Sequence, residues 1–135
     1  YPSVDEFERS IEAFASKGLK VMVTEWDMSA LPTVSQSANI SDTVAAKREY
    51  DPYYPNPLPD SVSTLWNERM ASFWNLFIKH SDKIQRVTAW GVTDATSWKN
   101  DYPIPGRHDS PLLFDREGRP KPFIKEFMLS QRRKN

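Results

Sequence analysis

Two short apolar runs limit the folds open to this chain, because each follows an amphipathic helical segment and precedes a polar, proline-rich loop. The runs cover residues 20–27 and 84–92, and each stays largely apolar until polar residues end it. Strands that are buried on both faces have this composition and are typical of a parallel sheet covered by helices. The order helix, strand, long loop, helix, strand, loop, helix therefore predicts an α/β fold built from βαβ units.

The first helical segment, residues 3–16, has clear signals at both ends. Ser3 is a candidate N-cap, Glu6 completes a capping box, and Gly18 follows the end of the helix. A link of only two or three residues joins this helix to the first apolar run, as in the second half of a βαβ unit. The strand expected before the helix is not in the sequence, so we expect the chain to be part of a larger fold.

The second helical segment, residues 60–79, has the longest apolar periodicity in the chain. Asp60 or Ser61 is expected to cap it, and His80 stands at its end, where a partly charged imidazole suits the helix dipole. Its expected core face consists of Leu65, Trp66, Met70, Phe73, Trp74, Phe77 and Ile78. Pro122 can open a third helix, whose expected core face consists of Phe123, Ile124, Phe127 and Met128.

Two long loops follow the apolar runs. The first, residues 28–59, carries five prolines and could form a helical turn at residues 41–49. The second, residues 94–122, is rich in turn-forming residues, and its short apolar run at residues 111–115 is expected to pack back on the body. Loops of this length inside compact domains are uncommon and are usually functional.

The composition favours a neutral partner. Lys plus Arg and Asp plus Glu number 18 each, so no net field attracts nucleic acid or an anionic membrane surface. No apolar run reaches the length of a membrane span. The chain has no Cys, which excludes disulfides and thiol chemistry. Five Trp and an aromatic content of 13% suit stacking against sugar rings, although large aromatic residues also fill cores.

Individual loop residues could have either a ligand-binding role or a structural one. Tyr53 and Tyr54 could reach a substrate cleft, but the favoured expectation is that they pin their loop to the surface. His108 lies in the polar part of the second loop, where it could touch a ligand or simply be solvated.

Three carboxylates stand where the apolar runs end. Glu25, Asp27 and Asp94 all follow a predicted strand, and barrel enzymes hold their catalytic groups at the carboxyl ends of strands. Strict alternation places Glu25 and Asp27 on one face together with Val21 and Val23. If that face is a barrel interior, Glu25 and Trp90 look into the same mouth. The alternative is that such carboxylates cap neighbouring helices or pair with Arg.

The motifs that are absent narrow the chemistry. The sequence contains no Gly-rich phosphate loop, no HExxH or similar metal spacing, and no Gly-x-Ser-x-Gly elbow. Carboxylates and aromatic platforms remain, and glycoside hydrolysis uses that combination.

Several motifs, in the right order, closely resemble the last part of family 10 glycoside hydrolases, the endo-1,4-β-xylanases. They are residues 18–27, 89–98 and 111–115 and the pair Lys121–Pro122. The resemblance implies that the chain is the C-terminal part of a (β/α)8 TIM barrel, about strands seven and eight with their flanking helices. Residues 1–135 would then be one segment of a single catalytic domain, incomplete on its own.

The resemblance also implies roles for individual residues. Glu25 matches the family's nucleophile, and Asp27 matches the carboxylate that supports a histidine bonded to the nucleophile. Trp90 and Trp98 match the two tryptophans that wall the subsite where the glycosyl–enzyme forms. Trp26 stands where the family usually has Leu, and its side chain is expected to point away from the mouth. No metal and no organic cofactor is implied.

The function implied is the retaining endo-hydrolysis of 1,4-β-xylosidic linkages in xylan or xylo-oligosaccharides. The family's acid/base Glu and its histidine have no counterpart in this sequence, so the resemblance implies a partner, the N-terminal part of the same barrel. A polymeric substrate further implies a secreted, cell-surface or periplasmic location. Two alternatives stay open: another retaining β-glycanase such as a β-glucanase, and a non-catalytic carbohydrate-binding fragment.

Overall fold

The computed structural model describes residues 2–32, 51–53, 55–102 and 105–132 of the chain. Along the chain these residues form α1 (Val4–Ala15), β1 (Val21–Trp26), α2 (Asp60–Lys79), β2 (Ile84–Ala89), η2 (Asp94–Thr96) and α3 (Pro122–Arg132). The two strands pair in parallel, which confirms the predicted α/β arrangement. The helical turn expected at residues 41–49 lies outside the described residues, as does Tyr54.

The helix ends follow the expected rules in α1 but not in α2. In α1, the hydroxyl of Ser3 accepts a hydrogen bond from the backbone N–H of Glu6. The Glu6 carboxylate accepts in turn from the backbone N–H of Ser3, which completes the capping box. Gly18, at φ +77°, turns the chain just after the helix. The N-cap of α2 is Pro59, whose side chain makes no capping bond, so the expectation that Asp60 or Ser61 caps this helix is wrong.

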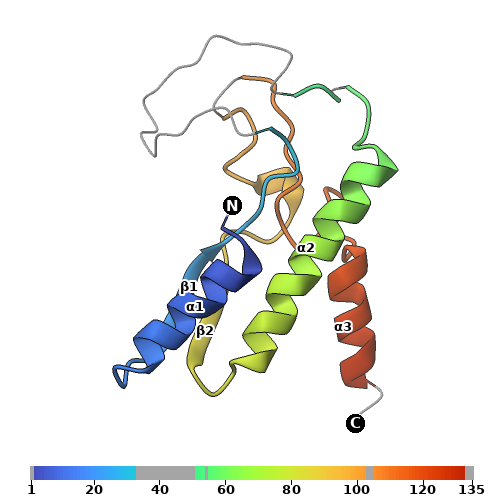
Figure 1. Ribbon diagram of the computed structural model, residues 1–135. Coiled ribbons are helices and arrows are strands. Elements are labelled where there is room, and N and C mark those ends of the chain that lie inside the picture. Colours follow the sequence, from blue (N-terminus) through green and yellow to red (C-terminus); the bar gives the residue numbers. More distant parts are fainter. Residues whose placement is uncertain (1, 33–50, 54, 103–104, 133–135) are drawn as a thin grey trace.

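Aromatic rings build the core between the helices and one face of the sheet. α2 lies between α1 and α3 and contacts both of them (Figure 1). Trp26 of β1 stacks on Trp74 of α2, with ring centroids 5.6 Å apart and planes 16° apart. The buried members of this cluster are Trp26, Trp66, Met70, Phe73, Phe77, Phe123 and Ile124. Burial of such large apolar surfaces is the main favourable contribution to folding.

The predicted core faces need three corrections. Leu65, Ile78 and Met128 were expected in the core but are 67%, 49% and 41% exposed. On α2 Leu76, which was not expected in the core, is buried. The apolar stripe of α2 is therefore narrower and rotated relative to the sequence pattern, because its neighbours α1 and α3 decide which positions they cover.

The strand pair is irregular, and this changes which residues share a face. Val23 pairs with Val87 and Trp26 with Ala89, so three steps along β1 match two steps along β2. Such an extra residue is a β-bulge, and it breaks the simple alternation of side chains. Val23 and Trp26 consequently both pack against the core cluster. The bulge therefore interrupts the expected alternation between Val23 and Trp26, whereas Val23, Glu25 and Asp27 still line one cavity.

The second strand ends at Ala89 rather than at the predicted Val92. The chain turns away at Gly91, which has φ +142° and touches the buried Leu112 so closely that a Cβ would lie 2.7 Å from that side chain. Only glycine fits such a position. The run at residues 111–115 thus packs back on the body as expected, with Pro111 and Leu112 buried.

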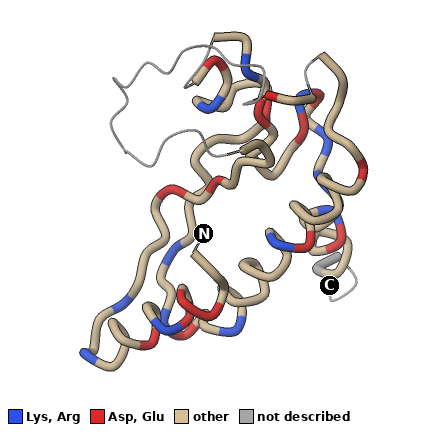
Figure 2. The backbone as a smooth tube through the Cα atoms, turned by 45° about the horizontal axis from the view of Figure 1, so that its top comes forward, with Lys and Arg blue, Asp and Glu red and all other residues tan. Residues whose placement is uncertain are grey.

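Both long loops leave the carboxyl ends of the strands, at the top of Figure 1. Figure 2 shows Lys and Arg intermixed with Asp and Glu along the described helices and loops, in keeping with the net charge of zero. Among the described helices none has the length and apolar character that a membrane crossing requires.

Candidate active site

Glu25 stands near the carboxyl end of β1, one residue before the buried Trp26. It is exposed, and it borders a cavity of about 220 Å³ whose lining comes largely from the core side, including Phe7 of α1 and Phe73 and Phe77 of α2. The anchor of this position is Trp26, whose ring is fixed in the core by contacts with Trp74 and Phe77. The buried indole thus holds the strand in place while the neighbouring carboxylate faces outward.

Asp27 is tied to the second loop through both of its carboxylate oxygens. The indole Nε1 of Trp98 donates to one oxygen at 2.8 Å, and the Nζ of Lys99 lies 3.4 Å from the other. The same Nζ sits 4.5 Å from the centre of the Trp98 ring, in cation–π range. Tyr102 packs on Trp98 with ring centroids 5.2 Å apart. Asp27 therefore fixes the orientation of Trp98, and Lys99 joins the two.

Trp90 is held beside the end of β1 by the backbone. Its N–H donates to the carbonyl oxygen of Trp26 at 3.1 Å, which continues the pairing of the strands by one step. Trp90 and Trp98 leave 49% and 44% of their surfaces exposed, although tryptophan is highly buried on average. Trp90, through its backbone N–H, and Trp98, through its indole N–H, are thus bonded to residues 26 and 27, the positions that directly follow Glu25.

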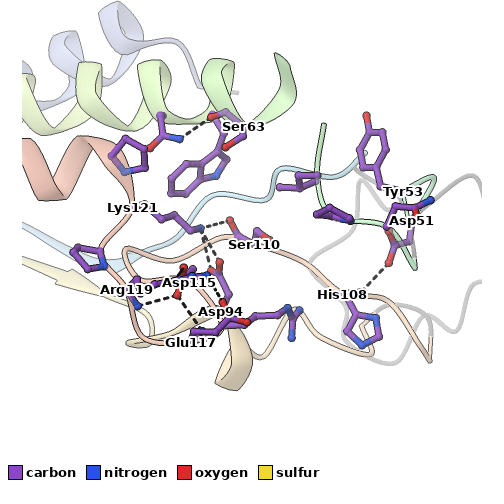
Figure 3. A pocket seen from close by; sticks show the side chains of 18 of the residues that line it. Asp51, Tyr53, Ser63, Asp94, His108, Ser110, Asp115, Glu117, Arg119 and Lys121 are labelled. Carbon is purple, nitrogen blue, oxygen red and sulfur yellow. Dashed lines mark hydrogen bonds and ion pairs between the residues drawn. The ribbon is translucent and has the colours of Figure 1, made fainter. Parts of the chain in front are cut away.

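The third strand-end carboxylate, Asp94, has a different environment. It is 2% exposed, accepts from the backbone N–H of Leu112 at 2.9 Å, and pairs with the Nζ of Lys121 at 2.9 Å (Figure 3). Burial raises the pKa of Asp94 and lowers the pKa of Lys121, and each partner opposes the shift of the other. Asp94 thus anchors the second loop through a buried ion pair.

A second buried carboxylate, Asp109, connects the two long loops. It is fully buried and accepts from the backbone N–H groups of Ala30 and Ser110, at 3.2 and 2.7 Å, and from the hydroxyl of Ser29. The guanidinium of Arg107, 6% exposed, lies 3.5 Å from it. These bonds hold the start of the first loop against the second, next to the ends of both strands.

A possible metal-binding group lies elsewhere in the described part of the chain. Ligand atoms of Glu8, Glu12 and His80 lie within 4.8 Å of one another. However, Lys79 donates to Glu8 at 2.7 Å, and Lys83 lies 3.2 Å from the other ring nitrogen of His80. The two lysines therefore already balance the negative charge of this group. His80, at the end of α2, is buried and bonded to Glu8 of α1, so it joins two helices.

Sequence reasoning found part of this arrangement. It picked out Glu25, Asp27, Trp90 and Trp98, which the structure brings to the end of one strand pair. It missed the loop residues that hold them, namely Lys99, Arg107, Asp109 and Lys121. Their signal would have been charged residues in a loop that is otherwise tightly packed, but partners 27, 78 or 80 positions away are not visible in a sequence pattern.

A comparison with protein-family models matches residues 1–129 to the model described as Glycosyl hydrolase family 10. Endo-1,4-beta-xylanase A from Xylanibacter ruminicola is 38% identical over 130 residues, which cover 95% of this chain and 35% of that protein. This chain thus spans about a third of the length of the relatives it matches.

Solved structures likewise match this chain to one part of a longer protein. The chain superimposes on a GH10 endoxylanase retrieved from sugarcane soil metagenome with a TM-score of 0.81 and 38% identity, covering 95% of this chain and 35% of that one. A mutant enzyme solved in complex with xylotriose gives a TM-score of 0.70 at 29% identity, over 93% of this chain and 34% of that one. The fold is therefore that of one part of a larger α/β domain.

Proposed function

Because the chain belongs to glycosyl hydrolase family 10, whose catalytic domains are (β/α)8 barrels, we propose that it supplies the nucleophile half of a retaining endo-1,4-β-xylanase site. The observation that carries the proposal is the position of the two exposed indoles. The backbone N–H of Trp90 is bonded to Trp26 and the indole N–H of Trp98 to Asp27, so both residues are held at the two positions that follow Glu25. A carboxylate between aromatic walls at a strand end is the arrangement that glycoside hydrolysis needs.

In the proposed reaction Glu25 acts as the nucleophile. Its ionised carboxylate attacks the anomeric carbon of a xylose unit, a carbon–oxygen bond forms, and the glycosidic bond breaks as its oxygen takes a proton from an acid. Water then attacks the same carbon, gives a proton back to the deprotonated acid and releases Glu25, so the configuration is retained. Retaining enzymes hold the two carboxyl groups about 5–5.5 Å apart. The proton donor belongs to the other part of the barrel.

Asp27 has a supporting role in this proposal. It orients Trp98 through the bond to the indole N–H, and in the complete site it would also support the histidine that contacts the nucleophile. A carboxylate has about four lone-pair positions, so the bonds to Trp98 and Lys99 leave capacity for a histidine N–H. Trp90 and Trp98 would hold the sugar ring.

The proposed partner is the N-terminal part of the same barrel. Two parallel strands cannot close a barrel, and each has one unpaired edge in the described structure. Met22 of β1 and Val92 after β2 are 51% and 67% exposed, as expected for surfaces that another part of the barrel covers. The chain alone is expected to be poorly folded and inactive. Xylan is a polymer, which favours a secreted, cell-surface or periplasmic enzyme.

Covalent labelling tests the proposed role of Glu25. The chain is combined with the N-terminal two thirds of the Xylanibacter ruminicola relative and treated with an activated 2-fluoroxylobioside. We expect one label per molecule on Glu25, no label in Glu25→Gln, and at least about a thousandfold loss of xylan hydrolysis in that variant. Glu126→Gln, an exposed carboxylate on α3, is the matched control and should react like the parent.

The outcomes separate the alternatives. Label on another residue, or an active Glu25→Gln enzyme, would remove Glu25 from the mechanism. Reversible binding of xylo-oligosaccharides with no covalent adduct would support a carbohydrate-binding fragment instead. Faster hydrolysis of β-glucan than of xylan by the combined enzyme would favour a β-glucanase.

A further inference from the structure

A second, larger cavity among the described residues lies away from Glu25. It encloses about 630 Å³ between the start of α2, the segment that includes Tyr53, and the second loop (Figure 3). This volume falls within the range of roughly 300–1,000 Å³ that small-molecule sites occupy. Neither Glu25 nor Asp27 lines it, and neither do Trp90 and Trp98.

The cavity is framed by fixed contacts between segments far apart in the sequence. The backbone N–H of His108 donates to the carboxylate of Asp51 at 2.8 Å, which joins the two long loops on one side. On the other side Lys121 donates to the carbonyl of Ser110 at 2.8 Å and sits 3.9 Å from the ring of Trp66. Figure 3 shows these two groups facing each other across the cavity.

The charged groups of the wall favour a neutral ligand, because most of them are paired with one another. Lys121 pairs with Asp94 at 2.9 Å, and Arg119 pairs with both Asp115 and Glu117 at 2.7 Å. Lys121 and Arg119 thus already have anionic partners within contact distance, while Arg116 donates to the neutral side-chain oxygen of Asn100 and to the backbone carbonyl of Asp109. An ionic ligand would have to break these pairs, whereas an uncharged ligand leaves them intact.

The rest of the lining suits a hydroxylated ring. Flat apolar surface comes from the ring of Tyr53 and from Pro55, Pro57, Pro120 and Pro122. Hydrogen-bonding groups come from Asn56, Asn67, Ser63 and Ser110, which offer both donors and acceptors. A sugar ring presents the complement, an apolar C–H face and an edge of hydroxyl groups. Pockets of mainly apolar surface with a few placed polar groups are typical of ligand sites.

We propose that this cavity is an accessory binding site for a neutral xylo-oligosaccharide, separate from the site of hydrolysis. The inference rests on the proposed xylanase function for the identity of the sugar. The cavity is built from the loops that leave the carboxyl ends of the strands, as is the Glu25 site, so one polysaccharide can be held by both. Tyr53 supplies the ring that stacks, and Asn56, which is exposed at the rim, binds hydroxyl groups.

The test measures sugar binding with the catalytic site filled. The combined enzyme, covalently labelled at Glu25 with 2-fluoroxylobioside, is titrated with xylohexaose by calorimetry. We expect one further binding event, weakened at least about tenfold in Tyr53→Ala and in Asn56→Ala. Tyr53→Phe, which keeps the ring, and Asn75→Ala, an exposed amide on α2, should bind like the parent. Hydrolysis of a short aryl xylobioside should be the same in all four variants.

The proposal is wrong if the labelled enzyme binds no xylohexaose, or binds it equally well in Tyr53→Ala. Full labelling of each variant at Glu25 shows that the variant is folded, so a loss of binding cannot come from unfolding. Failure of the label itself would count against the proposed nucleophile and not against the accessory site. In that case the titration is done with a Trp90→Ala/Trp98→Ala protein. Xylohexaose binding that is lost on a further Tyr53→Ala change supports the accessory site. No such binding would overturn the accessory site.

Discussion

The two ends of the molecule are stabilised by different kinds of interaction. Between the helices and the sheet, aromatic rings pack on one another, as when the ring of Phe7 meets that of Phe73 at 5.6 Å and an angle of 82°. At the loop end, buried charged groups take their place, including Asp94 paired with Lys121, and Asp109 beside Arg107. Apolar burial has no preferred direction, whereas each buried charge needs a particular partner.

The difference explains where a candidate site can form. A core of rings tolerates changes in its neighbours, provided that volume is kept. The buried charges fix the loops within narrow limits, and those loops carry Trp98 and Lys99 to Asp27. Substitutions in the core should therefore lower stability, and substitutions among the buried charges should lower stability and activity together.

Phe73→Ala should have the largest effect on stability. Phe73 is 5% exposed and touches Phe7 and Phe77, so its loss should cost about 3–5 kcal/mol of unfolding free energy. Urea unfolding of the combined enzyme measures this, and the kcat of whatever remains folded should be unchanged. Leu65→Ala, on the exposed side of the same helix, should cost less than about 0.5 kcal/mol. Equal effects of the two substitutions would contradict the assigned core.

Lys121→Met should lower stability by about 3 kcal/mol, because it leaves Asp94 charged, buried and without its cation. The double variant Asp94→Asn/Lys121→Met should recover most of this loss, since no uncompensated charge remains. Lys125→Met, on the exposed face of α3, is the control and should behave like the parent. If the double variant is no more stable than Lys121→Met, the ion pair does not hold the loop end. Xylan hydrolysis should follow the same order among the variants.

Lys99→Met should change activity more than stability. The substitution removes the cation that lies between Asp27 and the ring of Trp98, contacts worth about 1 kcal/mol together. We expect a fall of about fivefold in kcat/KM on xylotriose, with Lys99→Arg recovering most of it. Steady-state kinetics and urea unfolding on the same samples measure both quantities. A stability loss with unchanged kcat/KM would show that Lys99 belongs to the scaffold and not to the site.

The smallest effect concerns pH. The hydrogen bond from Lys79, followed by that from His80, lowers the pKa of Glu8 below its usual 4.5. The stability contributed by ionised Glu8 is therefore present above pH 4.5 and is lost as the pH falls through the lowered pKa. Glu8→Gln should be slightly less stable than the parent at pH 6 and equal to it at the acid end. Urea midpoints from pH 3 to 7 measure this. Glu126→Gln is the control, and its difference in midpoint from the parent should not change with pH.

Periodicity in the sequence predicted the parts of the fold that rest on apolar burial. The spacing in α2 and the two apolar runs sufficed to predict the parallel pair, and Ser3 with Glu6 predicted the start of α1. The exposed side of α2, including Leu65, was missed because neighbouring helices decide it. The buried loop charges, such as Asp109 with Ala30, were missed because partners 79 positions apart leave no periodic trace. The candidate roles of Glu25, Asp27, Trp90 and Trp98 came from the motif resemblance and stay predictions.

The bulge in β1 makes the number of residues in this strand as important as their identity. Between Val23 and Trp26 the chain contains one more residue than regular pairing with β2 requires. A shift of the opposite sense lies between Val21 and Met22, so the two irregularities compensate, and a deletion between Val23 and Trp26 would move Trp26 relative to Trp74. We therefore expect this short segment to tolerate no change of length, and any transfer of the strand to another scaffold would have to carry the extra residue with it.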